Sequence, residues 1–158
     1  MKARTKLSWR QLAWVLVIWA TFGCGRSDRA VEATPETISN HATVSVRWEE
    51  SLESAVERAR NEDKAVLVNF YAEWCVWCQR MESTTLRDGG VAALLSERLV
   101  PVSLDVDSEG EELSTEYGVE ALPTVLVLDA SGHELGRIPG YLPPAGFVEA
   151  IESFLPAS

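Results

Sequence analysis

Residues 65–78 read AVLVNFYAEWCVWC, and this stretch decides how the rest of the chain is interpreted. Its first half, AVLVNFY (65–71), is an almost continuous apolar run with β-branched and aromatic residues, which is typical of a strand buried on both faces. Two cysteines, Cys75 and Cys78, follow at once. We therefore expect the pair at the carboxyl end of a central strand, where open α/β sheets place their functional sites.

Strand and helix patterns alternate on both sides of this stretch, which predicts an α/β fold with helices on both faces of a central sheet. Helical patterns cover 51–60, 78–86, 91–98 after a possible Asp88 cap, 111–117 before Gly118, and the end of the chain from Pro144. Strand patterns cover 44–48, 99–107 and both arms of a hairpin over 123–138. The predicted order is β-α-β-α-β-α-β-β-α, with the hairpin as an antiparallel pair at the sheet edge.

Composition narrows the class of protein. The chain has 158 residues, of which 46% are hydrophobic, so one folded domain is expected and wholesale disorder is not. The formal net charge is −10, which argues against a nucleic-acid-binding protein, because such binding depends on lysine and arginine against phosphate. No feature calls for a cofactor.

The amino terminus has the architecture of an export signal. Basic residues without acids precede an apolar run over 12–22, which is shorter than the roughly 20 residues that span a bilayer. The run ends in TFGC, which resembles the lipobox of bacterial lipoproteins, with Thr21 where leucine is usual. That resemblance implies lipidation of Cys24 and removal of residues 1–23. Ordinary cleavage nearby, an uncleaved anchor and no export are the alternatives.

The position of the cysteine pair favours thiol chemistry. A helix N-terminus carries partial positive charge, so a thiol in the first turn has its thiolate stabilised. Cys75 takes that place, and Cys78, three residues on, shares its face of the helix. The second thiol is close enough to form a disulfide with the first or to attack a mixed disulfide held by it.

Three other uses of the pair are weighed against redox activity. A zinc site usually needs four ligands, and no second pair of cysteines or histidines exists. His133 stands alone on a predicted turn. A Cys–His hydrolase is possible in principle, but the second cysteine would inactivate the nucleophile. A structural disulfide fits an oxidising compartment, but so short a loop loses little chain entropy on closure. Redox exchange is the favoured interpretation.

Three motifs together resemble the thioredoxin fold family: VLVNFYAEWCVWC (66–78), YGVEALPTVLVLDASG (117–132) and GYL (140–142). Within it the chain is most similar to the C-terminal periplasmic domain of DsbD-type thiol:disulfide interchange proteins, in which WCVxC recurs. The resemblance covers about residues 48–155. It implies that Cys75 is the nucleophile, that Cys78 is the resolving cysteine, and that Pro123 is a cis-proline lying against their disulfide.

The resemblance also suggests where a partner protein would be contacted. Trp74 matches the aromatic residue beside the nucleophile, and Val76 and Trp77 form the dipeptide between the cysteines. Leu122 precedes the cis-proline. We expect these four side chains to contribute to the partner-binding surface, although Trp77 could equally serve surface packing.

The chain departs from thioredoxins at a buried charge pair. Where they have an aspartate six residues before the nucleophile, and a lysine on the next strand, this chain has Asn69 and Ser103. Losing both together avoids an unpaired buried charge, but it removes the expected proton shuttle. Glu82, one turn after Cys78 on the same helix face and matched by an acid in DsbD-type domains, is our candidate base; a solvated surface glutamate is the equal alternative.

The full expectation has three segments: a lipoprotein-type signal peptide (1–23), a flexible tether (24–46) and a thioredoxin-like domain (47–158). We expect an exported, monomeric, lipid-anchored protein of the periplasm or cell envelope that reduces disulfides in partner proteins. With no histidine between the cysteines, a reductant is favoured over an oxidant. Electrons would come from a membrane reductase of the DsbD or CcdA type. The alternative is a non-catalytic binding module, such as a holdase or a metal-delivery protein.

Overall fold

Four strands form one mixed sheet in the order β2-β1-β3-β4. The computed structural model describes residues 45–156. The strands are β1 (Ala65–Tyr71), β2 (Leu99–Asp105), β3 (Thr124–Leu128) and β4 (Glu134–Pro139). β1 runs parallel to β2 and antiparallel to β3, which in turn is antiparallel to β4. The predicted central strand and the hairpin at the sheet edge are therefore both confirmed.

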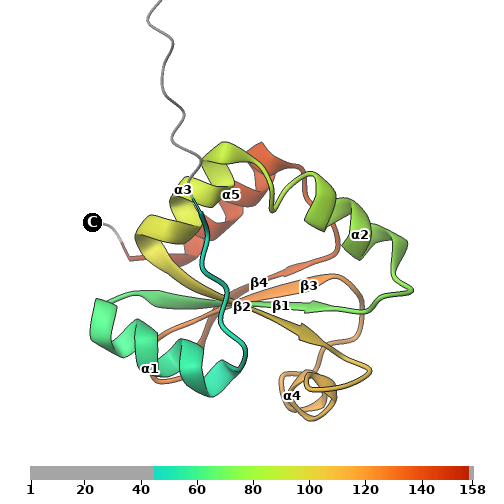
Figure 1. The fold of residues 1–158 in the computed structure, drawn as a ribbon, viewed down its shortest axis with the longest axis horizontal. Helices are drawn as coiled ribbons and strands as arrows, with labels where there is room; N and C mark the ends of the chain where they lie inside the picture. The colour runs from blue at the N-terminus through green and yellow to red at the C-terminus, as the bar shows by residue number, and fades with distance from the viewer. Residues whose placement is uncertain (1–44, 157–158) are drawn as a thin grey trace, which may run out of the picture. The chain divides into compact units, whose positions relative to one another are not determined.

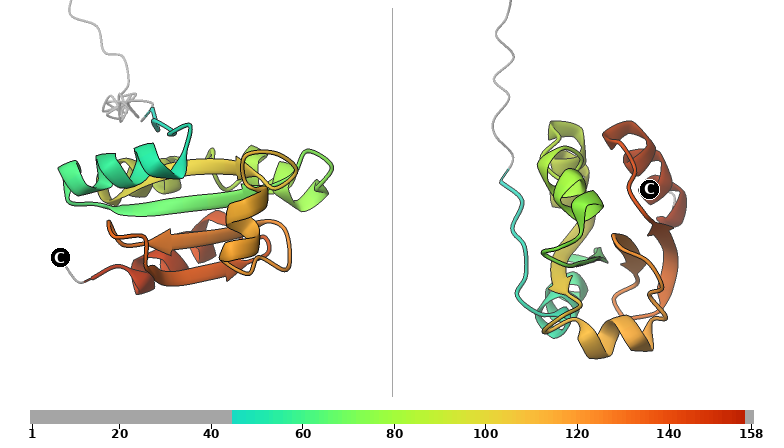
Figure 2. Two further views of the ribbon diagram at one scale, coloured as in Figure 1. Left: turned by 90° about the horizontal axis from the view of Figure 1, so that it is seen from below. Right: turned by 90° about the vertical axis from the view of Figure 1, so that its right-hand side faces the viewer.

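Helices cover both faces of this sheet (Figure 1). They are α1 (Leu52–Glu62), α2 (Val76–Ser83), α3 (Gly89–Arg98), α4 (Glu111–Glu116) and α5 (Pro144–Phe154). α1 lies on one face, and α3 and α5 lie beside each other on the opposite face, as the two views of Figure 2 show. None of the helices in residues 45–156 is long and apolar enough to cross a membrane.

Local sequence signals set several helix ends. Ser51 caps α1 through its hydroxyl, which accepts the Ser54 N–H at 3.2 Å. The Asp88 carboxylate accepts two N–H groups at the start of α3, and Pro144 begins α5. The first N–H groups of a helix have no partner within the helix, and the Ser51 and Asp88 side chains accept them. Proline has no N–H, so Pro144 leaves no such donor at the first position of α5. The cap predicted at Asp88 and the start predicted at Pro144 are confirmed.

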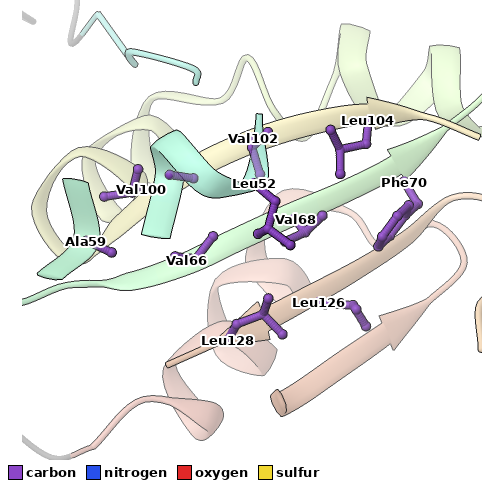
Figure 3. Close-up of a cluster of buried hydrophobic side chains, with 11 residues drawn as sticks. Leu52, Ala59, Val66, Val68, Phe70, Val100, Val102, Leu104, Leu126 and Leu128 are labelled. Atoms are coloured by element: carbon purple, nitrogen blue, oxygen red, sulfur yellow. The ribbon is translucent and has the colours of Figure 1, made fainter. Parts of the chain in front are cut away.

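The alternation of side chains along β1 divides the core into two clusters. Val66, Val68 and Phe70 lie on one face of β1 and join one cluster with residues of α1, which Figure 3 shows. Leu67, on the other face, packs with residues of α2, α3 and α5. Burying each such side chain contributes about 1.5–3 kcal/mol. β1 is thus held on both faces, which gives the segment after its end a rigid support.

Two predicted elements differ from the structure. Residues 45–48 form no strand; only Glu49 bridges β2, through its N–H to the Pro101 carbonyl at 2.8 Å. Pro101 has no N–H to donate to residues 45–48, so the hydrogen-bonded ladder does not extend to that segment. α2 ends at Ser83 rather than at residue 86, because the buried Thr85 turns away to donate its hydroxyl to the Leu142 carbonyl at 2.6 Å.

Candidate active site

The cysteine pair lies where β1 ends and α2 begins. Cys75 is the N-cap residue of α2, and its sulfur accepts the Cys78 N–H at 3.1 Å. The two sulfurs form a disulfide with an S–S distance of 2.15 Å. Both cysteines are only 6% exposed, so exposure does not distinguish them. Their placement at a strand end and a helix start is the one that the sequence predicts.

An outer groove of about 580 Å³ opens on the Cys75 side of the disulfide. It is lined by Cys75 and by all four residues expected to contact a partner: Trp74, Val76, Trp77 and Leu122. Three of these are unusually exposed for apolar side chains, at 68% for Trp74, 73% for Val76 and 54% for Trp77. Exposed apolar side chains gathered around a groove are typical of a protein-contact surface.

An inner cavity of about 660 Å³ lies on the Cys78 side. Cys78 lines it together with Asn69, Ser103, Glu82 and Trp48. Asn69 is 7% exposed and faces Ser103 across the β1–β2 ladder, where its Nδ2 donates to the Ser103 hydroxyl at 3.0 Å. The two cysteines therefore face different spaces: the first the outer groove, the second a polar cavity.

Glu82 shares the inner cavity with Cys78 but stays close to solvent. Its side chain is 70% exposed and lies 3.7 Å from Arg87. Tyr71 lines the same cavity, and burial together with nearby carboxylates raises the pKa of its hydroxyl above the usual value. The cavity has both polar and apolar walls and is large enough for water between Glu82 and Cys78.

The Leu122–Pro123 peptide bond is cis, as the resemblance implies. Pro123 itself is buried, and its carbonyl accepts the Gly140 N–H at 2.7 Å. The outer groove is lined instead by the four residues before it, Val119 to Leu122. Leu122 also packs against the cysteine pair. The groove wall on this side is therefore made by the segment before the proline.

Four residues of the site were not found from the sequence. Arg80 places its guanidinium 5.5 Å from the ring centre of Trp77 and 5.2 Å from that of Tyr141. A hydrogen bond with Thr84 lowers the pKa of Tyr141, and Arg80 adds to this effect. Trp48 and Asp107 are the other two. Tyr141 belongs to the GYL motif, but its role was not predicted. Trp48, Asp107 and Tyr141 come from segments distant in the chain from the cysteines, and Arg80 lies two residues after Cys78.

Two expectations need a separate statement. Cys24 lies outside the described residues, so its lipidation stays a prediction. Within residues 45–156, no group of three or more histidine, cysteine, aspartate or glutamate side chains is placed to hold a metal ion.

Comparison with known proteins agrees with this geometry. Residues 52–155 match the family described as a thioredoxin-like domain. The chain is 31% identical over 136 residues to the thiol:disulfide interchange protein DsbD of Actinobacillus pleuropneumoniae, an alignment that covers 82% of this chain and 21% of that protein. It thus spans about a fifth of the length of the curated relatives it matches.

Solved structures give the same result. A thioredoxin from Thermus thermophilus superimposes with a TM-score of 0.63 at 35% identity, over 69% of this chain and 86% of that one. The C-terminal domain of DsbD from Neisseria meningitidis, in the oxidised form, gives a TM-score of 0.57 at 28% identity, over 69% of this chain and all (100%) of that one. The chain therefore belongs to the thioredoxin-like family of disulfide oxidoreductases, and Cys75 and Cys78 are its Cys-x-x-Cys pair.

Proposed function

We propose that this protein reduces disulfide bonds in partner proteins through Cys75 and Cys78. The observation that carries the proposal is the position of Cys75 at the N-cap of α2, with its sulfur accepting the Cys78 N–H at 3.1 Å. Once the disulfide is reduced, the same N–H and the positive end of the helix would stabilise a thiolate on Cys75. A thiolate is the attacking species in thiol–disulfide exchange.

The exchange has two steps. In the first, the Cys75 thiolate attacks one sulfur of the partner's disulfide; the Cys75–partner bond forms, the partner's bond breaks, and the other partner sulfur leaves as a thiolate. In the second, Cys78 loses its proton and attacks Cys75, and the partner's remaining thiolate is released. The protein ends oxidised as the Cys75–Cys78 disulfide, and the partner carries two thiols after protonation.

The direction follows from what surrounds the pair. Strong oxidants of this chemistry are strong because their reduced, thiolate form is stabilised. Between the cysteines this chain has only Val76 and Trp77, neither of which carries a positive charge. The helix terminus is thus the main source of thiolate stabilisation on this segment. We infer a reductant for this reason.

The second step needs a base for Cys78. Asn69 cannot accept a proton at neutral pH, and Glu82 is the carboxylate that shares the inner cavity with Cys78 on α2. We propose that Glu82 accepts the proton through water in that cavity.

In the outer groove, Trp74, Val76, Trp77 and Leu122 would hold the partner's chain, while cis-Pro123 keeps the segment before it against the disulfide.

The proposed setting is the cell envelope. The signal architecture of residues 1–23 supports export, and the TFGC sequence supports a lipid on Cys24. The DsbD name of the relatives supports a membrane protein of the DsbD or CcdA type as the electron donor.

We expect the Cys24→Ala variant to be lost from the membrane fraction while the folded domain keeps its rate of disulfide exchange. An unmodified mature N-terminus elsewhere in the wild-type chain would contradict the lipid anchor.

Turnover of insulin disulfides with an added reductant tests the activity. We expect activity in the wild type, none in Cys75→Ser, and accumulation of mixed disulfides in Cys78→Ser, seen by mass spectrometry without reducing agent. Trapping by Cys75→Ser instead would reverse the two roles. Binding of a partner without any turnover would favour the alternative, a non-catalytic holdase or metal-delivery module.

A further inference from the structure

One side of the outer groove is built from an acidic part of the chain that carries no basic residue. Between Arg98 and Arg137 the sequence contains no lysine or arginine. This interval forms β2, the loop after it, α4 and the segment that reaches the cis bond, and so makes up the groove wall that faces Trp74. Its exposed acids between β2 and the cis bond are Asp107, Glu109, Glu111, Glu112, Glu116 and Glu120. Of these, Glu120 lines the groove and Asp107 bonds to Trp74. None of these six takes part in an ion pair with another side chain of residues 45–156.

The two tryptophans at the groove differ in their surroundings. Trp77 makes a cation–π contact within the chain, with the Arg80 guanidinium 5.5 Å from its ring centre. Trp74 has none among the described residues, and it is the more exposed of the two, at 68%. Its indole Nε1 donates instead to the Asp107 carboxylate at 2.6 Å.

That hydrogen bond makes Trp74 and Asp107 a single unit. It holds the indole in one orientation and places a carboxylate at the edge of the ring. A cation above an indole face is attracted by the ring's π electrons, and a carboxylate beside it adds charge attraction. Glu120 lines the same groove and is exposed. Arg137 is held in an ion pair by Glu134, and the charge of Glu120 also raises the pKa of its guanidinium.

We propose that Trp74, Asp107 and Glu120 form a subsite for an arginine or lysine side chain of the partner protein, next to the partner's reactive cysteine. This inference rests on the proposed function, and it adds the class of substrate: disulfides flanked by a basic residue. Acidic segments would be repelled on this side. The preference would depend on ionic strength, because the groups involved are exposed.

Peptides that differ in one residue test the proposal. Each carries a single cysteine in a mixed disulfide with 2-thiopyridine, and either arginine, glutamine or glutamate two positions away, on each side in turn. Cys75 attacks the peptide sulfur; the Cys75–peptide bond forms, the peptide–thiopyridine bond breaks, and 2-thiopyridone leaves with the electron pair. Stopped-flow absorbance of the released thiopyridone gives the rate, which is divided by the rate of the same peptide with mercaptoethanol.

We expect the arginine peptide to react about fivefold faster than the glutamine peptide, and the glutamate peptide to be slowest. The difference should shrink between about 20 mM and about 500 mM salt. Asp107→Asn keeps an oxygen acceptor for the indole N–H but removes the charge, so it should lower the preference. Glu120→Gln should do the same. Glu152→Gln, which removes an exposed carboxylate of α5 that has no ion pair within residues 45–156, should keep it.

Each contrary result has one meaning. Equal normalised rates for the three peptides in the wild type would overturn the basic-residue subsite and leave the reductase intact. An equal loss of preference in Glu152→Gln would assign the effect to net charge and would also overturn the subsite. No thiopyridone release with any peptide would refute the proposed function itself.

Discussion

Replacing Asn69 by aspartate would test how strictly the inner cavity excludes an unpaired charge. Asn69 is 7% exposed, and its amide donates to the Ser103 hydroxyl, which cannot neutralise a carboxylate. Two other carboxylates, Glu73 and Glu82, line the same cavity, with Arg87 as the cation. Burial without a partner raises the pKa of a carboxyl group, here by about 2 units from about 3.9. At about 1.4 kcal/mol per unit, the variant loses about 3 kcal/mol at pH 7.

The sign of the pH dependence follows from that raised pKa. Well below pH 4 the new carboxyl is protonated in both the folded and the unfolded chain, so the charge penalty is absent, and at about pH 4 it is still small. The penalty grows as the pH rises above about 4 and is complete above the folded pKa, near 6. Urea unfolding at about pH 4 and about pH 7, compared with wild type, measures the difference in free energy of unfolding.

A second variant and a control make the result specific. Ser103 pairs with Asn69 in the β1–β2 register, so adding Ser103→Lys to Asn69→Asp should recover at least half of the loss at pH 7. Asn61→Asp introduces the same charge at an exposed position of α1 and should cost less than about 1 kcal/mol. A loss of stability in Asn69→Asp that is the same at both pH values would refute the reasoning, because ionisation of the buried carboxyl would then not be its cause.

Three further predictions concern the base, a close contact and an ion pair. Glu82→Gln should slow release of the mixed disulfide about tenfold near neutral pH while barely changing its formation, measured by stopped-flow of each half-reaction; equal release rates across about pH 6 to 9 would remove this residue from the mechanism. Gly136→Ala should destabilise the fold by about 1–3 kcal/mol in urea, because a methyl group there would overlap the Phe154 ring; unchanged stability would mean that the ring moves freely aside. Hydrogen bonds led by that from Arg58 lower the Glu62 pKa from 4.5 to about 2, so the difference in Tm between wild type and Glu62→Gln should be present at pH 7 and vanish as the pH falls from about 4.5 to about 2; a difference that persists at about pH 2 would contradict it.

The sequence was informative where structure depends on neighbours in the chain. The apolar run over 65–71 predicted a buried strand, and Asp88 and Pro144 marked helix starts that the structure confirms. The Cys75–Cys78 spacing brought the two thiols together on one turn of helix. Each of these depends on backbone periodicity or on a side chain a few residues away, which a sequence pattern records directly.

Local patterns did not predict the end of α2 or the absence of a strand over residues 45–48. A helical pattern continues to residue 86, but the helix stops at Ser83 because Thr85 bonds to Leu142, a residue of the loop after β4. The alternating pattern before Ser51 resembles a strand, yet the adjacent edge of β2 offers Pro101, which has no N–H to donate. In both cases a partner that is distant in the chain decided the outcome.

The sequence by itself determined that two thiols lie at the start of a helix after a central strand. Only the tertiary structure decided what each thiol faces. The Trp74–Asp107 hydrogen bond spans 33 residues, and the Asn69–Ser103 bond spans 34. Such pairs depend on the register between β1 and β2 and on the path of the chain after β2, so no local pattern encodes them. The uncharged Asn69–Ser103 pair follows from the β1–β2 register, and the acids beside the outer groove follow from the path of the chain after β2.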